Sequence, residues 1–337
     1  MGQSINGIYV ALIISYNMII LNIFSMWQNE SIASSFETHD MKIAIVGKNG
    51  LLGRALSSHA VSKNLCEGQG FVSLDLPDFD VTSRRYALET LGEIKPDVII
   101  NTAGVTMIDW LEKKPNTART VHVQGTANLR EAAKRSDALL VQISCAEVFS
   151  HVSAMQTIGD FSPFSEEITP YPESVYAKTK LDGERAAGEA QRHLIVRTGP
   201  LFGKVGDRSA GHLVETLLTS LRRQEKMSVI NDQWASYTWA DDLARAIFAL
   251  IERRCTGLYH VANTGMASPF DMAQEIARQT GIRREYTPIS AADYGFVAHR
   301  AKYTVLKTAK YDAVEGVPKL PDWQTALSHY LVSRNAT

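Results

Sequence analysis

The sequence predicts an α/β protein built around a doubly wound parallel sheet. Three observations support this prediction. From Met41 onwards, short apolar runs alternate with helical stretches, which is the pattern of parallel strands joined by crossover helices. A glycine-rich turn directly follows the first apolar run. The chain has 337 residues, 45% of them hydrophobic, so it can bury a large core in one or two domains.

The alternation is clearest up to about residue 200. The opening strand, Ile43-Ala-Ile-Val46, has no polar position, as expected for a strand that is buried on both faces of a sheet. Strands end where polar or small residues follow an apolar run, and the stretches between them show helical periodicity. The predicted strands are 42–46, 71–76, 97–101, 138–144 and 193–197, and the predicted helices are 51–62, 82–93, 116–135 and 173–191.

The pattern changes beyond residue 200, where helices alternate with shorter strands. Pro318 and Pro321 precede a final helix, which we expect from Trp323 to about Val332. We therefore predict a nucleotide-binding domain of residues 41–200. We also predict a small C-terminal α/β lobe of residues 201–337 that mainly binds substrate, with some segments returning to the core. The expected helices are 211–224, 239–253 and 268–281, and the expected strands include 227–230 and 257–261.

Residues 1–40 differ from the rest of the chain. Residues 8–27 form a run of about twenty mostly apolar residues, long enough to cross a bilayer, yet no Lys or Arg precedes Lys42. Secretory signals usually begin with a basic region. A membrane anchor, a cleaved signal and an upstream extension outside the working protein all stay open as interpretations. We favour the extension and a cytoplasmic protein, because Met41 opens directly into the first strand.

Charge and cysteine content argue against several classes of function. The formal net charge is -1, so the chain lacks the basic excess that nucleic acid binding requires. Cys66, Cys145 and Cys255 are odd in number and widely spaced. This spacing argues against a disulfide framework or a zinc site and suits a reducing compartment. We expect no nucleic acid partner and no metal.

The turn after the first strand predicts a dinucleotide site of the Rossmann type. Its glycines follow a GxxGxxG spacing between a strand and a helix. Gly47 permits the tight turn, Gly50 lets backbone approach a phosphate, and Gly53 lets the helix pack close to the sheet. A pyrophosphate would then lie on the helix N-terminus, whereas an ordinary strand-to-helix turn is the alternative. The residues assigned to the cofactor here are Gly47, Asn49, Gly50, Leu51, Leu52 and Gly53.

Later strand ends add to this site. Asp75, at the end of the second strand, is placed to bond an adenosine ribose hydroxyl, which favours NAD over NADP. A plain turn residue before Pro77 is the alternative. Small residues at the end of the third strand would let a cofactor lie close to backbone, although such residues also suit a tight turn. The further cofactor residues that we assign are Asp80, Val81, Ala103, Gly104 and Val105.

Tyr176 and Lys180 point to the chemistry. Residues four apart lie on one face of a helix, so the Lys180 ammonium can lower the pKa of the Tyr176 phenol. Reduction of a ketone needs a hydride on carbon and a proton on oxygen, and such a tyrosine can supply the proton. Lys180 can also bond the cofactor ribose. A pair on the helix surface is the alternative interpretation.

From Met41 to Leu331 the chain resembles the dTDP-4-dehydrorhamnose reductase family of extended short-chain dehydrogenase/reductases. The later segments matter most, because they are not general features of nucleotide-binding folds. The resemblance implies that NADPH or NADH reduces C4 of a nucleotide-activated 4-keto-6-deoxy sugar, and a homodimer is one expected assembly. The segments that carry it are MKIAIVGKNGLLGRAL, KPDVIINTAGVTMID, YAKTKLDGE, LIVRTGPLFG, INDQWASYTWADDLA, GLYHVANTG and PDWQTAL.

The departures from the family lie at the substrate end. Cys145 replaces a hydroxyl that would hold the substrate carbonyl, and a thiol is the weaker hydrogen-bond donor. Glu147 stands where the family has a tyrosine, and His122 where extended relatives commonly carry an asparagine that organises a proton-relay water. We assign Cys145 to catalysis beside Tyr176 and Lys180. The substrate residues implied by the resemblance are Thr106, Asp109, Glu147, Trp234 and Arg300.

Two interpretations of these departures stay open. The first is an active reductase with an altered substrate or a lower rate. The second is a catalytically weakened NAD(P)-binding protein with a regulatory or scaffold role. Tyr176 and Lys180 favour the enzyme, although both residues would also serve simply to hold a ribose. Covalent catalysis by Cys145 is disfavoured, since the sequence indicates no His–Asp partnership for it.

Overall fold

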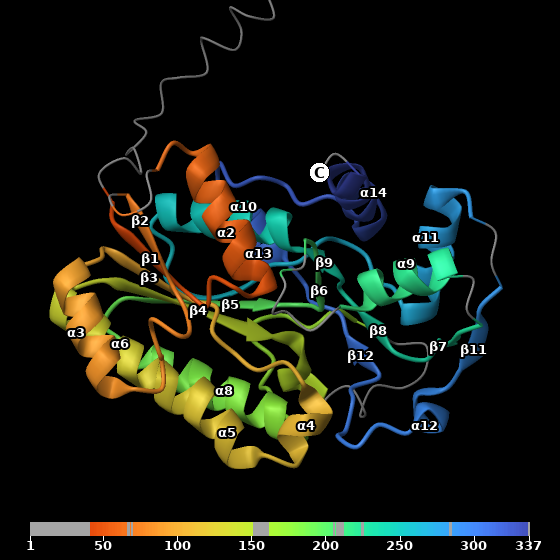
Figure 1. Ribbon diagram of the computed structural model, residues 1–337, viewed down its shortest axis with the longest axis horizontal. Helices are drawn as coiled ribbons and strands as arrows, with labels where there is room; N and C mark the ends of the chain where they lie inside the picture. The colour runs from red at the N-terminus through yellow and green to blue at the C-terminus, as the bar shows by residue number, and fades with distance from the viewer. Residues whose placement is uncertain are drawn as a thin grey trace, which may run out of the picture. The chain divides into compact units, whose positions relative to one another are not determined.

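A six-stranded parallel sheet forms the centre of the fold (Figure 1), in the order β10-β5-β4-β3-β1-β2. The chain moves from β1 to one edge and then returns to build the other side from β3. The carboxyl ends of β1 and β3 therefore border the switch point where such sheets bind ligands. The strands are β1 (Ile43–Val46), β2 (Phe71–Leu74), β3 (Val98–Asn101), β4 (Leu139–Cys145), β5 (His193–Thr198) and β10 (Gly257–His260).

The computed structural model describes residues 41–335, except 66, 67, 69, 151–161, 205, 207–211, 224–225 and 283–284. The apolar segment 8–27 and Cys66 lie outside the described residues. Residues 38–337 form one compact unit. Among the described residues, no helix is long and apolar enough to cross a membrane.

Helices cover both faces of the sheet (Figure 1). On one face, α2 and α10 pack against each other, and their leucines and isoleucines join the core side chains of β1, β3, β4 and β5. On the other face, α3 and α6 bury alanine and leucine side chains against Ala44, Ile99 and Leu140. The helices are α2 (Leu51–Ser62), α10 (Ala240–Glu252), α3 (Arg84–Ile94), α6 (Gly125–Ser136) and α8 (Val175–Gly188).

Three further sheets of two strands each pair β11 with β7, β12 with β8, and β6 with β9. Helices α9, α11 and α14 pack with β6, β7, β8 and β9 around a separate apolar core, whereas α13 packs against β10 in the main core. The strands are β6 (Leu201–Phe202), β7 (Ser228–Ile230), β8 (Trp234–Ala235), β9 (Thr238–Trp239), β11 (Thr287–Ile289) and β12 (Tyr303–Thr304). The helices are α9 (Leu213–Arg223), α11 (Pro269–Thr280), α12 (Ala291–Tyr294), α13 (Ala309–Asp312) and α14 (Trp323–Asn335).

Two predictions about individual elements need correction. The helix predicted over 116–135 is continuous in the structure, but a π-helical turn η2 (Thr120–Gln124) interrupts its α-helical geometry between α5 (Pro115–Arg119) and α6. The wider turn places the buried His122 against the loop after β3 and against α8. The helical pattern of the sequence does not predict these contacts. The strand predicted over 71–76 ends at Leu74, because the Asp75 carboxylate turns back to accept backbone N–H groups.

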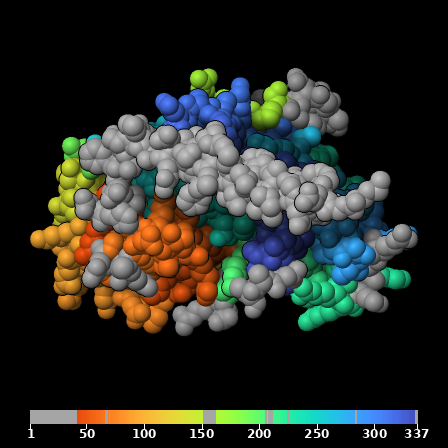
Figure 2. Space-filling model, turned by 90° about the horizontal axis from the view of Figure 1, so that it is seen from above, coloured from red at the N-terminus to blue at the C-terminus, as the bar shows by residue number. Residues whose placement is uncertain are grey.

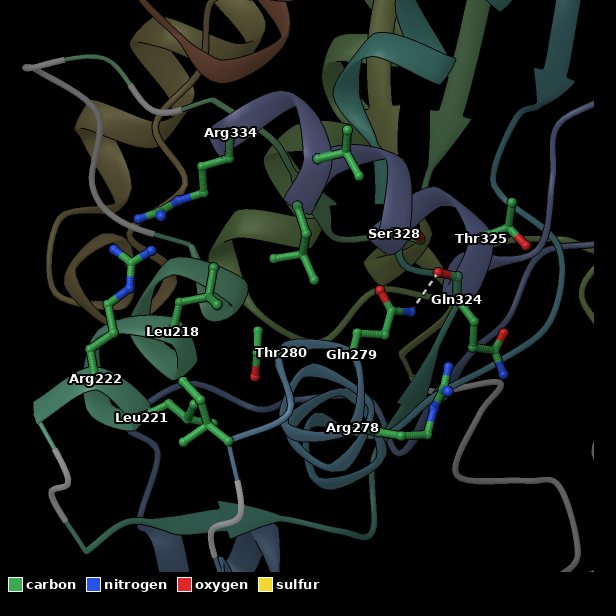
Figure 3. A pocket seen from close by; sticks show the side chains of 13 residues that line it. Leu218, Leu221, Arg222, Arg278, Gln279, Thr280, Gln324, Thr325, Ser328 and Arg334 are labelled. Carbon is green, nitrogen blue, oxygen red and sulfur yellow. Dashed lines mark hydrogen bonds between the residues drawn. The ribbon is translucent and has the colours of Figure 1, made fainter. Parts of the chain in front are cut away.

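A surface pocket of about 700 Å³ lies between α9, α11 and α14 (Figure 3). Leucines form part of its wall, and Arg222, Arg278 and Arg334 lie around it. None of the residues that we assigned to cofactor or substrate lines it. Figure 2 shows one face of the molecule, on which α2 (orange) and α14 (dark blue) are both exposed.

A buried ion pair joins α8 to β5. The Arg197 Nε and Nη2 atoms donate to Glu184 Oε1 and Oε2 at 2.9 and 2.7 Å, and these side chains are only 4% and 6% exposed. The hydroxyl of Ser144 also donates to this carboxylate. The pair therefore links the helix that carries Tyr176 to two neighbouring strands.

We predict that Glu184→Gln lowers the free energy of unfolding by about 3 kcal/mol, because Arg197 is left buried without its anion. Urea denaturation at pH 7 measures this loss. Glu131→Gln is the control, since Glu131 pairs with the exposed Arg84 on the surface and its loss should leave the midpoint almost unchanged. Equal midpoints for the two variants would contradict the assigned role of the buried pair.

Candidate functional site

Close backbone contacts shape the turn between β1 and α2. Gly47 has φ +91°, and a Cβ atom there would lie 2.6 Å from Thr102 Oγ1 and 2.7 Å from the Ala103 nitrogen. A Cβ atom on Gly53 would lie 2.2 Å from the Gly47 carbonyl oxygen. No other residue fits either place without moving backbone. The glycines thus bring the ends of β1, α2 and β3 into direct contact.

The N-terminus of α2 faces the same turn. Its N-cap is Gly50, which offers no side-chain cap, and its first turn contains no acidic residue. The first N–H groups of a helix have no partner within the helix and carry a partial positive charge. Leu51 and Leu52 contribute such groups here. The turn therefore has the open backbone and the positive helix end that a diphosphate requires.

Asp75 lies against this glycine turn. Its Oδ2 atom accepts the Asn49 N–H at 2.8 Å, and its Oδ1 atom accepts the Leu76 N–H at 2.7 Å. The Asp80 carboxylate instead closes its own turn by accepting the backbone N–H and the hydroxyl of Thr82, at 2.9 and 2.7 Å. Asp75 thus lies within the predicted nucleotide site, whereas the Asp80 carboxylate stabilises the segment before α3.

The loop after β3 closes the opposite side. The Thr102 hydroxyl donates to the carbonyl of Val46 at 2.8 Å, and Asn101 Oδ1 accepts the Ala103 N–H at 3.1 Å. A Cβ atom on Gly104 would meet only ordinary contacts, the nearest being His122 Nε2 at 3.6 Å, so no close approach requires glycine there. This loop holds the predicted cofactor residues Ala103, Gly104 and Val105 beside the glycine turn, followed by the exposed Thr106.

Tyr176 and Lys180 lie on the first turns of α8, each 9% exposed. Ser174 caps this helix by accepting the Ala177 N–H, and Glu112 accepts the N–H of Val175 at 2.9 Å. Lys180 Nζ donates to the carbonyl of Ile143 at 2.6 Å. Helix α8 is thereby fixed to β4 near the carboxyl end of the strand.

The electrostatics of the pair differ from our expectation that Lys180 lowers the pKa of Tyr176. Burial, followed by Cys145 and Glu147, holds the pKa of the Tyr176 phenol well above its usual value. Burial lowers the pKa of the Lys180 ammonium, while Cys145 and Glu184 oppose that change. In this state of the site burial outweighs any lowering of the Tyr176 pKa by Lys180, and Cys145 and Glu147 raise it further.

Cys145 ends β4 beside these residues. Its thiol and the Tyr176 hydroxyl are hydrogen-bonded to each other. Burial is the largest cause that raises the pKa of the Cys145 thiol, to about 11, although Lys180 lowers it. The thiol is therefore protonated at neutral pH, which makes it a weak donor and a poor nucleophile.

The predicted substrate residues come together from several elements. Arg300 Nη2 lies 3.1 Å from Asp109 Oδ1, on α4 (Ile108–Glu112), and the same oxygen accepts the N–H groups of Val297 and Ala298 at 3.1 and 2.9 Å. Burial raises the pKa of Glu147 to about 7, while Arg300 and the N–H of Ala301 oppose that shift. Asp109, Glu147 and Arg300 therefore form one polar cluster.

Trp234, on β8, and Cys145 pack against the same apolar cluster, which includes Phe149, Phe164 and Tyr303. The Trp234 N–H donates to the carbonyl of Lys302 at 2.8 Å, so its strand is tied to the segment that carries Arg300. Thr106 has no contact of this kind with the polar cluster among the interactions described for the chain. The structure thus brings Asp109, Glu147 and Arg300 together directly, links Trp234 to them only through the segment of Lys302, and shows no such link for Thr106 among the described interactions.

Sequence reasoning missed Thr179 as a partner of His122. Thr179 lies between Tyr176 and Lys180 on α8, and its hydroxyl contacts His122 Nδ1 at 2.9 Å. His122 is buried and receives the Val105 N–H on its other ring nitrogen at 3.1 Å. The motif Tyr-Ala-Lys-Thr-Lys contains Thr179, but only the π-helical turn places a histidine opposite it.

Comparisons with known proteins agree with this geometry. The family model described as the RmlD substrate binding domain matches residues 41–335. The dTDP-4-dehydrorhamnose reductase of Salmonella typhimurium is 30% identical over 313 residues, covering 88% of this chain and 99% of the relative. That of Mycolicibacterium smegmatis is 30% identical over 289 residues, covering 85% and 84%.

Solved structures of similar proteins have the same fold. A dTDP-4-dehydrorhamnose reductase from Clostridium acetobutylicum superimposes with a TM-score of 0.79 and 31% identity, covering 88% of this chain and 100% of the other. The Bacillus anthracis dTDP-4-dehydrorhamnose reductase in complex with NADP gives 0.78 and 28%, covering 87% and 99%. The chain belongs to the RmlD substrate binding domain family, the family of the dTDP-4-dehydrorhamnose reductases.

Proposed function

We propose that this protein is an NAD(P)H-dependent reductase of a nucleotide-activated 4-keto-6-deoxy sugar, of the dTDP-4-dehydrorhamnose reductase type. It would supply deoxysugars for polysaccharide synthesis. One observation carries the proposal: a protonated, buried tyrosine lies beside a buried lysine at the carboxyl edge of the sheet, where Lys180 is fixed to Ile143. The named activities of the relatives support the same reaction.

The residues of the glycine turn fit a nicotinamide dinucleotide. Gly47 and Gly53 leave the backbone open, the α2 N-terminus would hold the diphosphate, and Asp75 would bond the adenosine ribose. The reduced nicotinamide, when bound, supplies the hydride. Asp80 and Val81 would line the adenine side, and Ala103 to Val105 the nicotinamide side.

Tyr176 would donate its proton to the ketone oxygen. The phenol is protonated at neutral pH, as proton donation requires, although its raised pKa makes it a weaker acid. Lys180 would stabilise the phenolate that forms, because its charge is buried nearby and bonded only to a neutral carbonyl in the contacts described. The Cys145 thiol would polarise the ketone weakly.

The polar cluster would receive the nucleotide-sugar. Arg300 is the cation placed to meet its diphosphate, with Asp109 and Glu147 competing for that charge until substrate binds. Trp234 would pack on the sugar or base, and Thr106 would contribute a hydroxyl at the exposed rim. No observation favours a non-catalytic regulatory role over turnover. A cytoplasmic location and a homodimer stay predictions.

We predict that the wild-type protein oxidises NADPH or NADH when given dTDP-4-keto-6-deoxy sugars, and that Tyr176→Phe lowers kcat by roughly a hundredfold or more through loss of the proton donor. Absorbance at the nicotinamide band follows the reaction. Cofactor affinity, measured by tryptophan fluorescence, should stay within about threefold of wild type. Cofactor binding without turnover of any ketosugar by the wild type would refute the proposed function.

Cys145→Thr is expected to raise kcat by roughly tenfold, because a hydroxyl is a better donor than a thiol to the developing oxyanion. The matched control is Cys145→Ala, which removes the donor and should lower kcat. If threonine and alanine have the same effect, the Cys145 side chain does not polarise the ketone, and its place in the mechanism is wrong.

The activity should also depend on the ionisation of Glu147, whose pKa is about 7. Above that pH its carboxylate raises the pKa of Tyr176 and neutralises Arg300. Both effects oppose the reaction, so kcat/KM should fall several-fold, roughly three- to tenfold, between pH 6 and 8. Glu147→Gln should remove this decline and keep the rate at its low-pH level. An unchanged profile in that variant would assign the ionisation to another group.

A further inference from the structure

We propose that His122 is a positioning residue that fixes the catalytic helix α8 relative to the loop after β3, and that it acts as a neutral imidazole protonated on Nδ1. This inference rests on the proposed reductase activity. His122 connects two segments of the site and takes no part in proton transfer.

The backbone places His122 where it can make this connection. It lies in the π-helical turn η2, which packs directly against α8, and it is 3% exposed. A Cβ atom on Gly183 of α8 would come within 2.6 Å of the His122 carbonyl oxygen. The Thr126 hydroxyl donates to that same oxygen at 2.7 Å. The π-helical turn η2 and helix α8 are therefore in close backbone contact at His122.

The hydrogen bonds fix the tautomer. The Val105 N–H can only donate, so His122 Nε2, 3.1 Å away, accepts and carries the lone pair. The ring proton then lies on Nδ1, which faces Thr179 Oγ1 at 2.9 Å. The Thr179 hydroxyl donates its single proton to the carbonyl of Val175, at 2.8 Å, or to that of Tyr176, at 3.0 Å. Its oxygen is therefore free to accept the histidine proton.

This arrangement removes His122 from proton transfer. Both ring nitrogens are engaged with groups that stay uncharged, so neither is open to a substrate or a relay water. Burial, with the nearby Lys180 charge as a second cause, lowers the pKa of His122 to about 3. The imidazole is thus neutral throughout the pH range in which an enzyme of this kind works. Its ring meets the Tyr176 ring edge to face, with centroids 5.7 Å apart.

The two ends of the connection are functionally different. Val105 belongs to the loop predicted to hold the nicotinamide side of the cofactor, and Thr179 lies between Tyr176 and Lys180. A shift of either end changes the distance between the hydride source and the proton donor. Displacements of about 1 Å in such a geometry can cost roughly a hundredfold in rate. His122 consequently acts on the rate through position.

Three variants separate the two bonds. In His122→Gln the amide oxygen can replace Nε2 and keep the Val105 bond, whereas in His122→Asn the amide nitrogen can replace Nδ1 and keep the Thr179 bond. Thr179→Val removes the second bond from the other side. We expect each variant to lower kcat by roughly 10- to 100-fold at temperatures well below melting, with the dissociation constant of NADH or NADPH within about threefold of wild type.

The double variants give the sharper readout. His122→Gln has already lost the Thr179 bond, so adding Thr179→Val should lower kcat little further. In His122→Asn the bond to Thr179 is still present, and adding Thr179→Val should lower kcat again. A merely structural role predicts no such difference in kcat. His260→Gln is the matched control, because His260 is also fully buried with a pKa of about 3, and its ring contacts the Phe164 carbonyl and not a residue assigned to the cofactor, the substrate or catalysis. It should lower the melting temperature and leave kcat unchanged.

Nitrogen-15 NMR of histidine-labelled protein tests the tautomer without turnover. We expect His122 to keep a protonated Nδ1 and an unprotonated Nε2 from pH 5 to 9. A ring that titrates in this range, or variants that melt earlier but retain wild-type kcat, would overturn the proposal while the reductase activity stands. A wild-type protein that turns over no ketosugar would instead overturn the proposed function, and the positioning role with it.

Discussion

The active region depends on the close backbone approach at the β1–α2 turn. Because Gly47 and Gly53 have no side chains, α2 begins directly on the end of β1, and the loop after β3 lies against both. The Thr102 hydroxyl bonds the carbonyls of Val46 and Gly47, which ties that loop to the turn. The same loop reaches His122 and, through it, α8. A series of short polar contacts thus fixes the position of Tyr176 relative to the glycine turn.

The centre of the candidate site contains few charged groups. Tyr176 and Cys145 are both protonated near neutral pH and bonded to each other, and the buried Lys180 is held by a neutral carbonyl. Of the carboxylates that act on these groups, Glu147 interacts with Arg300, and Glu184, which raises the pKa of Lys180, is paired with Arg197. The buried Lys180 ammonium stabilises a phenolate at Tyr176 most strongly when no carboxylate lies closer to the ammonium. The distribution suits proton donation better than proton abstraction.

Much of the architecture could be predicted because it depends on local pattern. The apolar run of β1 and the glycine spacing together specify a strand, a turn and a helix, and the structure has all three. The helix predicted over residues 116–135 is present, but the sequence did not predict the π-helical turn within it. The apolar periodicity on either side of the turn is helical, and it does not predict the contacts of His122 with Val105 and Thr179.

The same distinction between local pattern and tertiary contacts applies to the candidate site. Motifs located Tyr176, Lys180 and the glycine turn, since these rely on spacing within one element. The pairing of Asp109 with Arg300 across 191 residues and the raised pKa of the phenol depend on which groups meet in space. Spacing within one segment placed Tyr176 and Lys180 on one helix, which the structure has, but it could not show that burial, with Cys145 and Glu147, raises the pKa of the phenol.

The placement of α10 and β10 has a consequence for biosynthesis. The apolar face of α2 is covered by α10, and the sheet is completed by β10, both of which follow the first strands of the C-terminal lobe in the sequence. The first 200 residues to leave the ribosome would expose that face and an unpaired edge of β5. The nucleotide-binding part can therefore reach its final packing only after His260 has been synthesised. Contacts of such long sequence separation slow folding. A nascent chain of this protein would need protection from aggregation for most of its synthesis.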